Sequence, residues 1–194
     1  MLSFRRPKDP YQYIRDNPGI KWRDFIPIPK GPIQYLEIGV FEATNTVDVL
    51  KSYCNHPDSV LHCVDPWVDY EDYPEYKGEI KNRYQIAMRN IQNSGQAHKF
   101  KIYRNFSDKI VPTFSDDFFD IIFIDGNHQT EFVYRDGVIS FEKAKKGGFL
   151  IFDDYTSEWP QTIVGIDKFL FEYKDRLSTP KLHPTCGQLF VQKL

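Results

Sequence analysis

The sequence predicts an α/β fold in which a mostly parallel sheet is doubly wound, with helices on both of its faces. Two observations support this prediction. From residue 33 onward, short apolar runs alternate with longer segments whose apolar residues recur at helical spacing. Several of the runs, YLEIGV, IIFID and FLIFD among them, are apolar almost throughout, which is typical of parallel strands buried on both faces.

The expected elements follow one another regularly along the chain. Apolar runs predict strands at 34–40, 59–64, 100–104, 118–124, 148–152 and 189–191. Helical spacing predicts helices at 44–53, 79–93, 131–145 and 160–173. The last helix opens with Pro160, which the first turn of a helix tolerates. A loop dense in aromatic and acidic residues, 66–78, separates the second strand from the second helix.

The chain has 194 residues and a mass of 22.9 kDa, which suits one domain. Residues 1–32 are rich in proline and charge, and we expect them to form an N-terminal arm or lid. Residues 33–194 then form a single domain. Phe, Tyr and Trp contribute 16, 12 and 3 residues, and a chain so rich in aromatics is expected to fold around a core.

Composition excludes several functional classes. The net charge of −2 argues against a nucleic-acid-binding module, which usually carries a basic face. No apolar run approaches the about 20 residues of a transmembrane helix, and MLSFRRPKDP lacks the apolar stretch of a signal peptide. Cys54, Cys63 and Cys186 show neither a disulfide framework nor zinc spacing. We therefore expect a cytoplasmic protein with neither a nucleic-acid nor a membrane partner.

Ligands of parallel α/β sheets bind beyond the carboxyl ends of the strands, so the residues at those ends matter most. Gly39 lies at the end of the first expected strand, where it permits a close turn around a ligand or simply a turn. Asp65 follows the second strand and is placed either to bind ribose hydroxyls or to initiate a turn before Pro66. Trp67 then packs beside an adenine or covers the core.

Acidic residues also follow the fourth and fifth strands, at Asp125 and at Asp153-Asp154. If these strands are neighbours, three carboxylates converge, and a divalent cation would relieve their repulsion. Oxygen ligands favour Mg²⁺, Mn²⁺ or Ca²⁺ over zinc. Solvent-exposed turn residues are the alternative interpretation. His128, three positions after Asp125, is a candidate proton acceptor or a structural hydrogen-bonding group.

Three segments in this order resemble class I S-adenosylmethionine (SAM)-dependent methyltransferases. They are LEIGVFEATNT, CVDPW and FDIIFIDGNHQTEFVYRDGVISFEKAKKGGFLIFDDY, and together they span about residues 33–155. The most similar members are the metal-dependent sugar O-methyltransferases of the macrocin and mycinamicin type. The resemblance implies a Rossmann-like, seven-stranded sheet, SAM as cofactor and a divalent metal, with Mg²⁺ expected.

The resemblance also assigns roles to individual residues. It implies that Asp125, Asp153 and Asp154 hold the metal, that Asp125 and His128 are catalytic, and that His128 is the candidate base. The implied cofactor-binding residues are Glu37, Gly39, Val40, Phe41, Thr44, Asp65, Trp67, Ser107 and Asp125. Many members have a second glycine where this chain has Ala43 or Thr44.

The expected reaction is metal-assisted methyl transfer from SAM to a hydroxyl of a sugar or glycan, which makes a small molecule or glycan the expected partner. The oligomeric state to test is a homodimer. Two alternatives stay open. Asp153-Asp154 resembles the metal motif of some glycosyltransferases, although the Glu37–Gly39 strand end would then be unexplained. The chain could also be a non-catalytic subunit that retains the methyltransferase fold.

Overall fold

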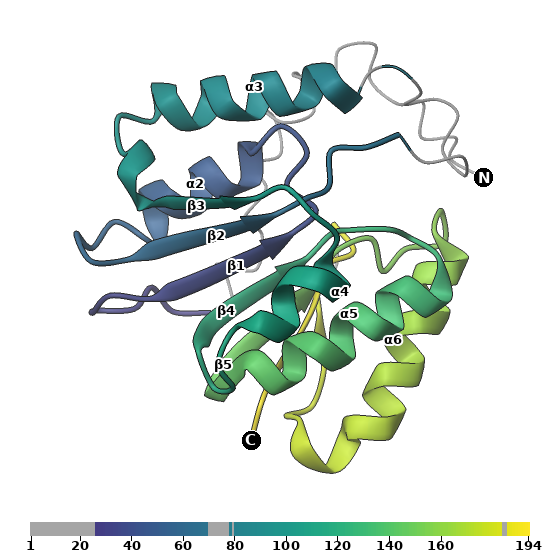
Figure 1. Cartoon of the computed structure of the whole chain (residues 1–194). Coiled ribbons are helices and arrows are strands. Elements are labelled where there is room, and N and C mark those ends of the chain that lie inside the picture. Colours follow the sequence, from purple (N-terminus) through teal and green to yellow (C-terminus); the bar gives the residue numbers. More distant parts are fainter. Residues whose placement is uncertain (1–25, 70–77, 79, 184–185) are drawn as a thin grey trace.

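The computed structural model describes residues 26–69, 78, 80–183 and 186–194. Within these residues, a seven-stranded sheet lies at the centre with helices on both faces (Figure 1). The order β3-β2-β1-β4-β5-β7-β6 confirms the predicted doubly wound, Rossmann-like sheet. The strands are β1 (Gln34–Ile38), β2 (Val60–Val64), β3 (Phe100–Tyr103), β4 (Phe119–Ile124), β5 (Ala144–Phe152), β6 (Lys181–Leu182) and β7 (Leu189–Gln192).

Strands β1 to β5 pair in parallel, whereas β7 pairs antiparallel with both β5 and β6. Helices on each face of the sheet make the parallel crossovers (Figure 1). One face carries α2 (Thr44–Ser52) and α3 (Ile80–Asn93), and the other carries α4 (Ser107–Ile110), α5 (Thr130–Lys143) and α6 (Pro160–Tyr173). Short 3₁₀ turns lie at Ala97–Lys99, Val111–Thr113 and Lys174–Arg176.

Each face of the sheet has its own hydrophobic core, because successive side chains of a strand point to opposite faces. In β1, Tyr35 packs into the core under α2 and α3, and Leu36 packs into the core under α5 and α6. The same alternation runs through β4, where Phe123 and Ile124 belong to different cores. Burial on both faces explains why these strands are almost wholly apolar in sequence.

The structure departs from the predicted elements in three places. Strand β5 begins at Ala144, whereas the sequence placed residues 144–145 in a helix. Ala144 is buried and pairs with Phe119, so strand pairing outweighs the helical preference of alanine. Helix α4 and strand β6 were not predicted, since four and two residues are too few to show a period. Strand β6 completes the seven-stranded sheet.

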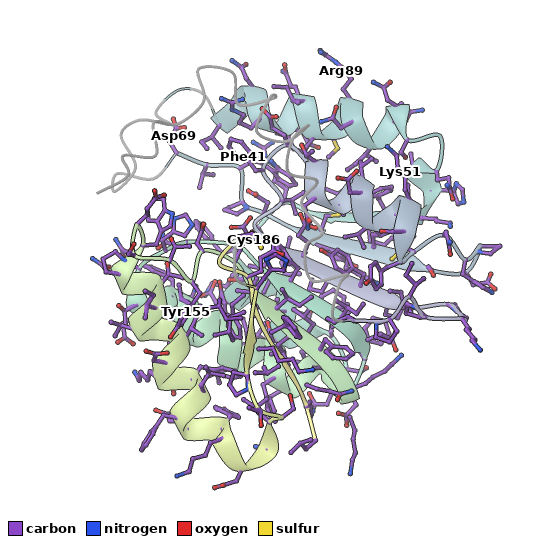
Figure 2. The ribbon with its side chains drawn as sticks, turned by 180° about the vertical axis from the view of Figure 1, so that it is seen from behind. Phe41, Lys51, Asp69, Arg89, Tyr155 and Cys186 are labelled. Atoms are coloured by element: carbon purple, nitrogen blue, oxygen red, sulfur yellow. The ribbon has the colours of Figure 1, made fainter. Side chains whose placement is uncertain are left out.

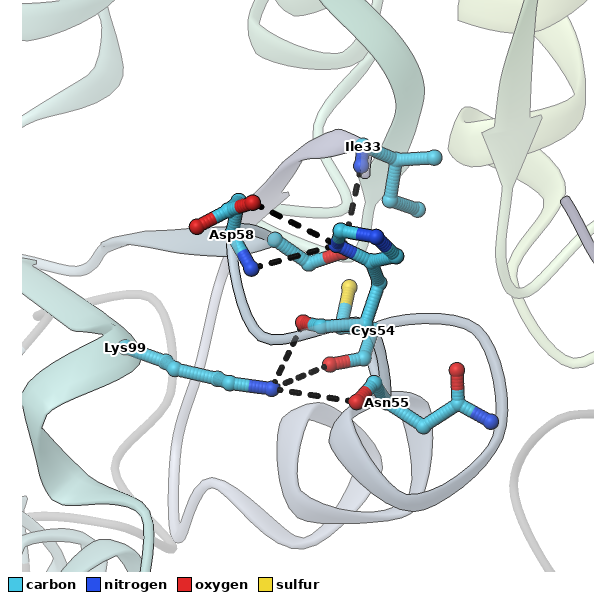
Figure 3. Close-up of polar contacts among 7 residues, drawn as sticks. Ile33, Cys54, Asn55, Asp58 and Lys99 are labelled. Carbon is cyan, nitrogen blue, oxygen red and sulfur yellow. Dashed lines mark hydrogen bonds and ion pairs between the residues drawn. The ribbon is translucent and has the colours of Figure 1, made fainter. Parts of the chain in front are cut away.

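A buried lysine caps the end of α2. The Lys99 ammonium donates to the carbonyl oxygens of Cys54, Asn55 and His56 at 3.0, 3.4 and 2.8 Å (Figure 3). Carbonyl groups beyond the end of a helix lack partners within the helix, and a cation there also complements the helix dipole. With only 4 % of its surface exposed, Lys99 satisfies three backbone acceptors, of which the carbonyl of Cys54 is buried.

We expect Lys99→Met to lower the free energy of unfolding by about 2–4 kcal/mol, because three carbonyl groups, one of them buried, would lose a charged donor. Urea denaturation monitored by circular dichroism measures this change. Lys51→Met is the matched control, since Lys51 is exposed in the last turn of α2. Equal stability losses in the two variants would contradict a capping role for Lys99.

Within the part of the chain that the structure describes, every helix is too short or too polar to cross a bilayer. Most of the predicted arm, residues 1–25, lies outside the described residues, and so does most of the aromatic and acidic loop, residues 70–77. The boundary between arm and domain therefore stays a prediction.

Candidate active site at the carboxyl edge of the sheet

Four neighbouring parallel strands end side by side. Ile38, at the end of β1, pairs with Val64 of β2 on one side and with Ile124 of β4 on the other. Ile124 in turn pairs with Phe152 of β5. The residues that come next in each strand therefore lie along one edge, and they are Gly39, Asp65, Asp125 and Asp153.

The turn from β1 into α2 has a tightly bent backbone. Gly39 has a φ of 84°, and a Cβ at this position would lie 1.8 Å from the backbone oxygen of Asp125. Glycine is thus required by the neighbouring strand end, whatever ligand the turn binds. Ala43, directly before α2, also has a left-handed backbone, with a φ of 59°. A glycine would adopt this conformation at lower cost than alanine.

Glu37 lies beneath this turn, with 1 % of its surface exposed. Its carboxylate accepts hydrogen bonds from the Tyr35 hydroxyl at 2.8 Å and from the Asn45 amide at 3.0 Å. Burial raises the pKa of Glu37 to about 7, although these hydrogen bonds oppose the shift. Glu37 therefore connects the end of β1 to the first turn of α2.

The Asp65 carboxylate binds the backbone of two loops. Its Oδ2 accepts the N–H groups of Val40 and Phe41, both at 2.9 Å, and its Oδ1 accepts the N–H of Trp67 at 2.7 Å. Burial raises the pKa of Asp65, and the three hydrogen bonds lower it. Trp67 is 3 % exposed, belongs to the core under α3 and donates its Nε1–H to the carbonyl of Phe41. Trp67 thus covers the core, which was one of its two predicted positions.

Ser107, at the start of α4, follows β3 as the sequence indicated. Its hydroxyl donates to Oδ1 of Asp136 at 2.6 Å, and both residues are buried. A Cβ at Gly126 would lie 3.3 Å from Oδ2 of Asp136, so this pair lies beside the loop after β4. Sequence reasoning assigned no role in the site to Asp136. The only available signal was that this acidic residue lies within the predicted helix 131–145.

Burial raises the pKa of Asp136 from 3.8 to about 6, while the bond from Ser107 opposes the shift. Because the pKa is higher in the folded state, folding takes up a proton between these two values, and stability falls as the pH rises through them. We expect Asp136→Asn to raise the free energy of unfolding at pH 7 by about 1–3 kcal/mol, and by much less near pH 4. Urea titrations of both proteins at the two pH values test this. A difference independent of pH would contradict it.

Beyond β4 and β5, a histidine lies between two acidic residues. Asp125, His128 and Asp154 place one potential ligand atom each within 4.8 Å of one another. His128 Nε2 is 2.9 Å from Oδ2 of Asp154. Burial raises the pKa of Asp125 well above its usual range, and the charges of Asp153 and Asp154 add to the shift. Two carboxylates and an imidazole form a donor set that suits a divalent cation.

Asp153 lies beside this group and is bound differently. Its Oδ1 accepts the N–H of Asp154 at 2.9 Å, and its Oδ2 accepts the Gln188 amide at 3.3 Å. Burial and the charge of Asp154 raise its pKa. The structure thus brings two of the three predicted metal ligands together with His128, and it holds the third against the segment before β7. The metal-binding role of all three stays a prediction.

Exposed apolar side chains surround this edge. Phe41, Val68, Phe106 and Phe132 follow β1, β2, β3 and β4, and each has between 37 % and 42 % of its surface exposed. In Figure 2, Phe41 and Asp69 lie on the side of α3, and Tyr155 lies on the side of α6. Cys186 lies between them in this view, in the segment before β7. Sequence reasoning missed Gln188, which donates to Asp153, because it belongs to no motif.

Solved structures of methyltransferases share this fold. The O-methyltransferase TomG of Streptomyces achromogenes, solved with SAM, has a TM-score of 0.60 at 14 % identity over 83 % of this chain and 72 % of its own. A putative O-methyltransferase of Klebsiella pneumoniae has a TM-score of 0.64 at 14 % identity, and the match covers 97 % of this chain and 82 % of its own. An rRNA methylase of Streptococcus thermophilus has a TM-score of 0.60 at 8 % identity, and the match covers 86 % of this chain and 90 % of its own. At these identities the comparisons establish the fold, which enzymes of different acceptors share.

Sequence comparison gives two further results. The uncharacterized protein R132 of Acanthamoeba polyphaga mimivirus is 29 % identical over an alignment of 146 residues, and the match covers 73 % of this chain. The chain matches 61 % of the length of that relative. A family model described as a methyltransferase domain matches residues 36–155, from β1 to just beyond β5, and so includes every strand end of the candidate site. The chain therefore belongs to this family of methyltransferase domains.

Proposed function

We propose that this protein is a SAM-dependent methyltransferase that transfers the methyl group to a hydroxyl oxygen. The observation that carries the proposal is the alignment of Gly39, Asp65 and Asp125 at one sheet edge, in a chain of the methyltransferase family. Ligands of such sheets bind at this edge. TomG, with the same fold, was solved in complex with SAM.

In this proposal SAM lies across the ends of β1, β2 and β3. Oδ2 of Asp65 holds the turn after β1 in shape. Among the described residues, Oδ1 accepts one N–H, that of Trp67, and it has a further lone pair for a ribose hydroxyl. The exposed rings of Phe41 and Phe106 lie where they can cover the adenine. The Ser107 hydroxyl donates to Asp136 and would shape the adenine end indirectly.

The finer part of the proposal concerns the reaction. Asp125 and Asp154 would hold a divalent cation beside His128, whose imidazole would stay outside the coordination sphere, and Asp153 would support the adjoining turn. Such an ion would stabilise negative charge on the acceptor oxygen. His128 is the proposed proton acceptor, and Asp154 would orient its imidazole and balance the positive charge that forms.

The proposed acceptor is a sugar or glycan hydroxyl. Its support is the resemblance to sugar O-methyltransferases together with Trp159 beside His128, since aromatic rings pack well on sugar faces. The net charge of −2 gives no support to a nucleic-acid acceptor. Methyl transfer from ¹⁴C-methyl SAM to a panel of methyl glycosides, with total RNA and catechol as comparators, tests this assignment.

Isothermal titration calorimetry of the full chain with SAM tests the cofactor. We expect micromolar affinity that depends little on EDTA. A separate titration with Mg²⁺ or Mn²⁺ should release heat that Asp154→Asn reduces strongly. Absence of SAM binding under every condition would overturn the proposal, and SAM binding without any metal response would favour the non-catalytic alternative.

We expect His128→Ala to slow methyl transfer at least about 100-fold, because the acceptor would lose its general base. The Kd for SAM should stay unchanged, since the cofactor lies across other strand ends. Single-turnover assays at saturating SAM measure the effect. A loss of only a few-fold would restrict His128 to orienting its neighbours.

A further inference from the structure

The indole of Trp159 lies against the imidazole of His128. The two ring centroids are 4.0 Å apart, and the ring planes differ by 28°. His128 also places Nε2 2.9 Å from Oδ2 of Asp154. The imidazole is therefore held by an indole on its face and by a carboxylate at its edge, and both come from the segment that follows β5.

The backbone of Trp159 is fixed by the first turn of α6. Its carbonyl oxygen accepts the N–H groups of Thr162 at 3.0 Å and Ile163 at 3.3 Å. Its own N–H donates to the carbonyl of Thr156 at 3.0 Å. The next residue, Pro160, opens α6 and restricts φ at that point. The indole is thus carried by an ordered helix end.

The same helix turn is tied to the segment that carries His128. The Thr162 hydroxyl donates to the carbonyl of His128 at 3.2 Å, and the Thr130 hydroxyl donates to the carbonyl of Gln161 at 3.1 Å. A Cβ at Gly165 would lie 2.7 Å from the carbonyl oxygen of Thr130, so α5 and α6 approach closely. Both partners of the stack therefore belong to one rigid frame.

Two contacts of different geometry restrict the imidazole more than either does alone. A hydrogen bond to one carboxylate oxygen holds an edge of the ring but allows the ring to tilt about that bond. Ring stacking restricts the tilt of the plane. We propose that Trp159 is a positioning residue that holds the His128 imidazole in the orientation in which it contacts Asp154 and faces the acceptor. The catalytic part of this inference rests on the proposed function.

Nuclear magnetic resonance of the full chain with ¹³C-labelled histidine tests the stack directly. An indole shifts the signals of a ring stacked on it, so Trp159→Leu should move the His128 signal and Trp159→Phe should retain much of the shift. His128→Asn assigns the signal. Phe171→Leu is the matched control, because Phe171 is also an α6 aromatic but is 72 % exposed. Its substitution should leave the His128 signal in place.

Kinetics test the catalytic consequence, with the most active methyl glycoside of the panel as acceptor. We expect Trp159→Leu to lower kcat about 10- to 100-fold, because misplacement of a reacting group by about 1 Å has an effect of this size. The Kd for SAM should not change. Trp159→Phe should restore most of the loss, which general destabilisation would not explain.

An unchanged His128 signal in Trp159→Leu would overturn the stack, and an unchanged kcat would overturn its role in catalysis. Failure of the wild-type protein to bind SAM is a different outcome, which counts against the proposed function. The magnetic resonance comparison needs no turnover and therefore tests the stack in either case, whereas the kinetics test the positioning role.

Discussion

Asp125→Asn is expected to abolish methyl transfer, with a loss of at least about 1,000-fold in kcat. The amide keeps the shape of the carboxylate but lacks the charge that a divalent cation and a developing imidazolium require. Affinity for SAM should stay nearly unchanged. Single-turnover assays and calorimetry measure these two quantities separately.

The free energy of unfolding of Asp125→Asn should rise, although its activity falls. Burial and the charges of Asp153 and Asp154 raise the pKa of Asp125, so its carboxylate opposes folding at neutral pH. The amide would remove that repulsion and raise the free energy of unfolding by about 1 kcal/mol or more. Asp116→Asn is the control, because Asp116 pairs with Lys143 and its side chain is 67 % exposed. Full activity in Asp125→Asn would remove the acidic group from the mechanism.

Gly39→Ala is expected to lower the free energy of unfolding by about 3–5 kcal/mol, the sum of backbone strain and steric overlap. The new Cβ would lie 1.8 Å from the backbone oxygen of Asp125, so β1 and β4 would have to separate at the site. SAM binding should be lost with it. Urea denaturation and calorimetry measure the two effects.

Gly95→Ala separates the contribution of backbone strain from that of steric overlap. Gly95 has a φ of 74°, close to the 84° of Gly39. Apart from its chain neighbours, however, no atom of the described residues lies within 4 Å of a Cβ built there. It should therefore show only the cost of a left-handed alanine, about 1–2 kcal/mol. Equal losses in the two variants would show that the contact with Asp125 contributes nothing.

Sequence patterns were most informative where an element is long or wholly buried. Helix α6 begins at Pro160 and ends at Tyr173 as the apolar spacing predicted, and β1, β2 and β4 differ from their predicted ranges only at the ends. Strand β6 escaped prediction because two exposed residues carry no periodic signal. The boundary between α5 and β5 was misplaced because the pairing of Ala144 with Phe119 outweighs local preference.

The candidate site was predictable to the extent that it follows strand ends. Asp65 was placed at the end of the second strand from its position alone, but its three backbone hydrogen bonds depend on how two loops meet. Asp136 was not predicted as a site residue, because its hydrogen-bond partner Ser107 lies 29 positions away in the sequence. Gln188 reaches Asp153 only through the antiparallel pairing of β7 with β5.

Chain order alone was sufficient to align Gly39, Asp65 and Asp125. Parallel strands that alternate with helices all point their carboxyl ends toward the same edge. The contacts of His128 depend also on the tertiary structure. Its contact with Asp154 follows from the pairing of β4 with β5, but its contact with Trp159 depends on how closely α6 packs on α5, where Gly165 lies against Thr130. That distance results from packing between segments remote in sequence, and no local periodicity encodes it.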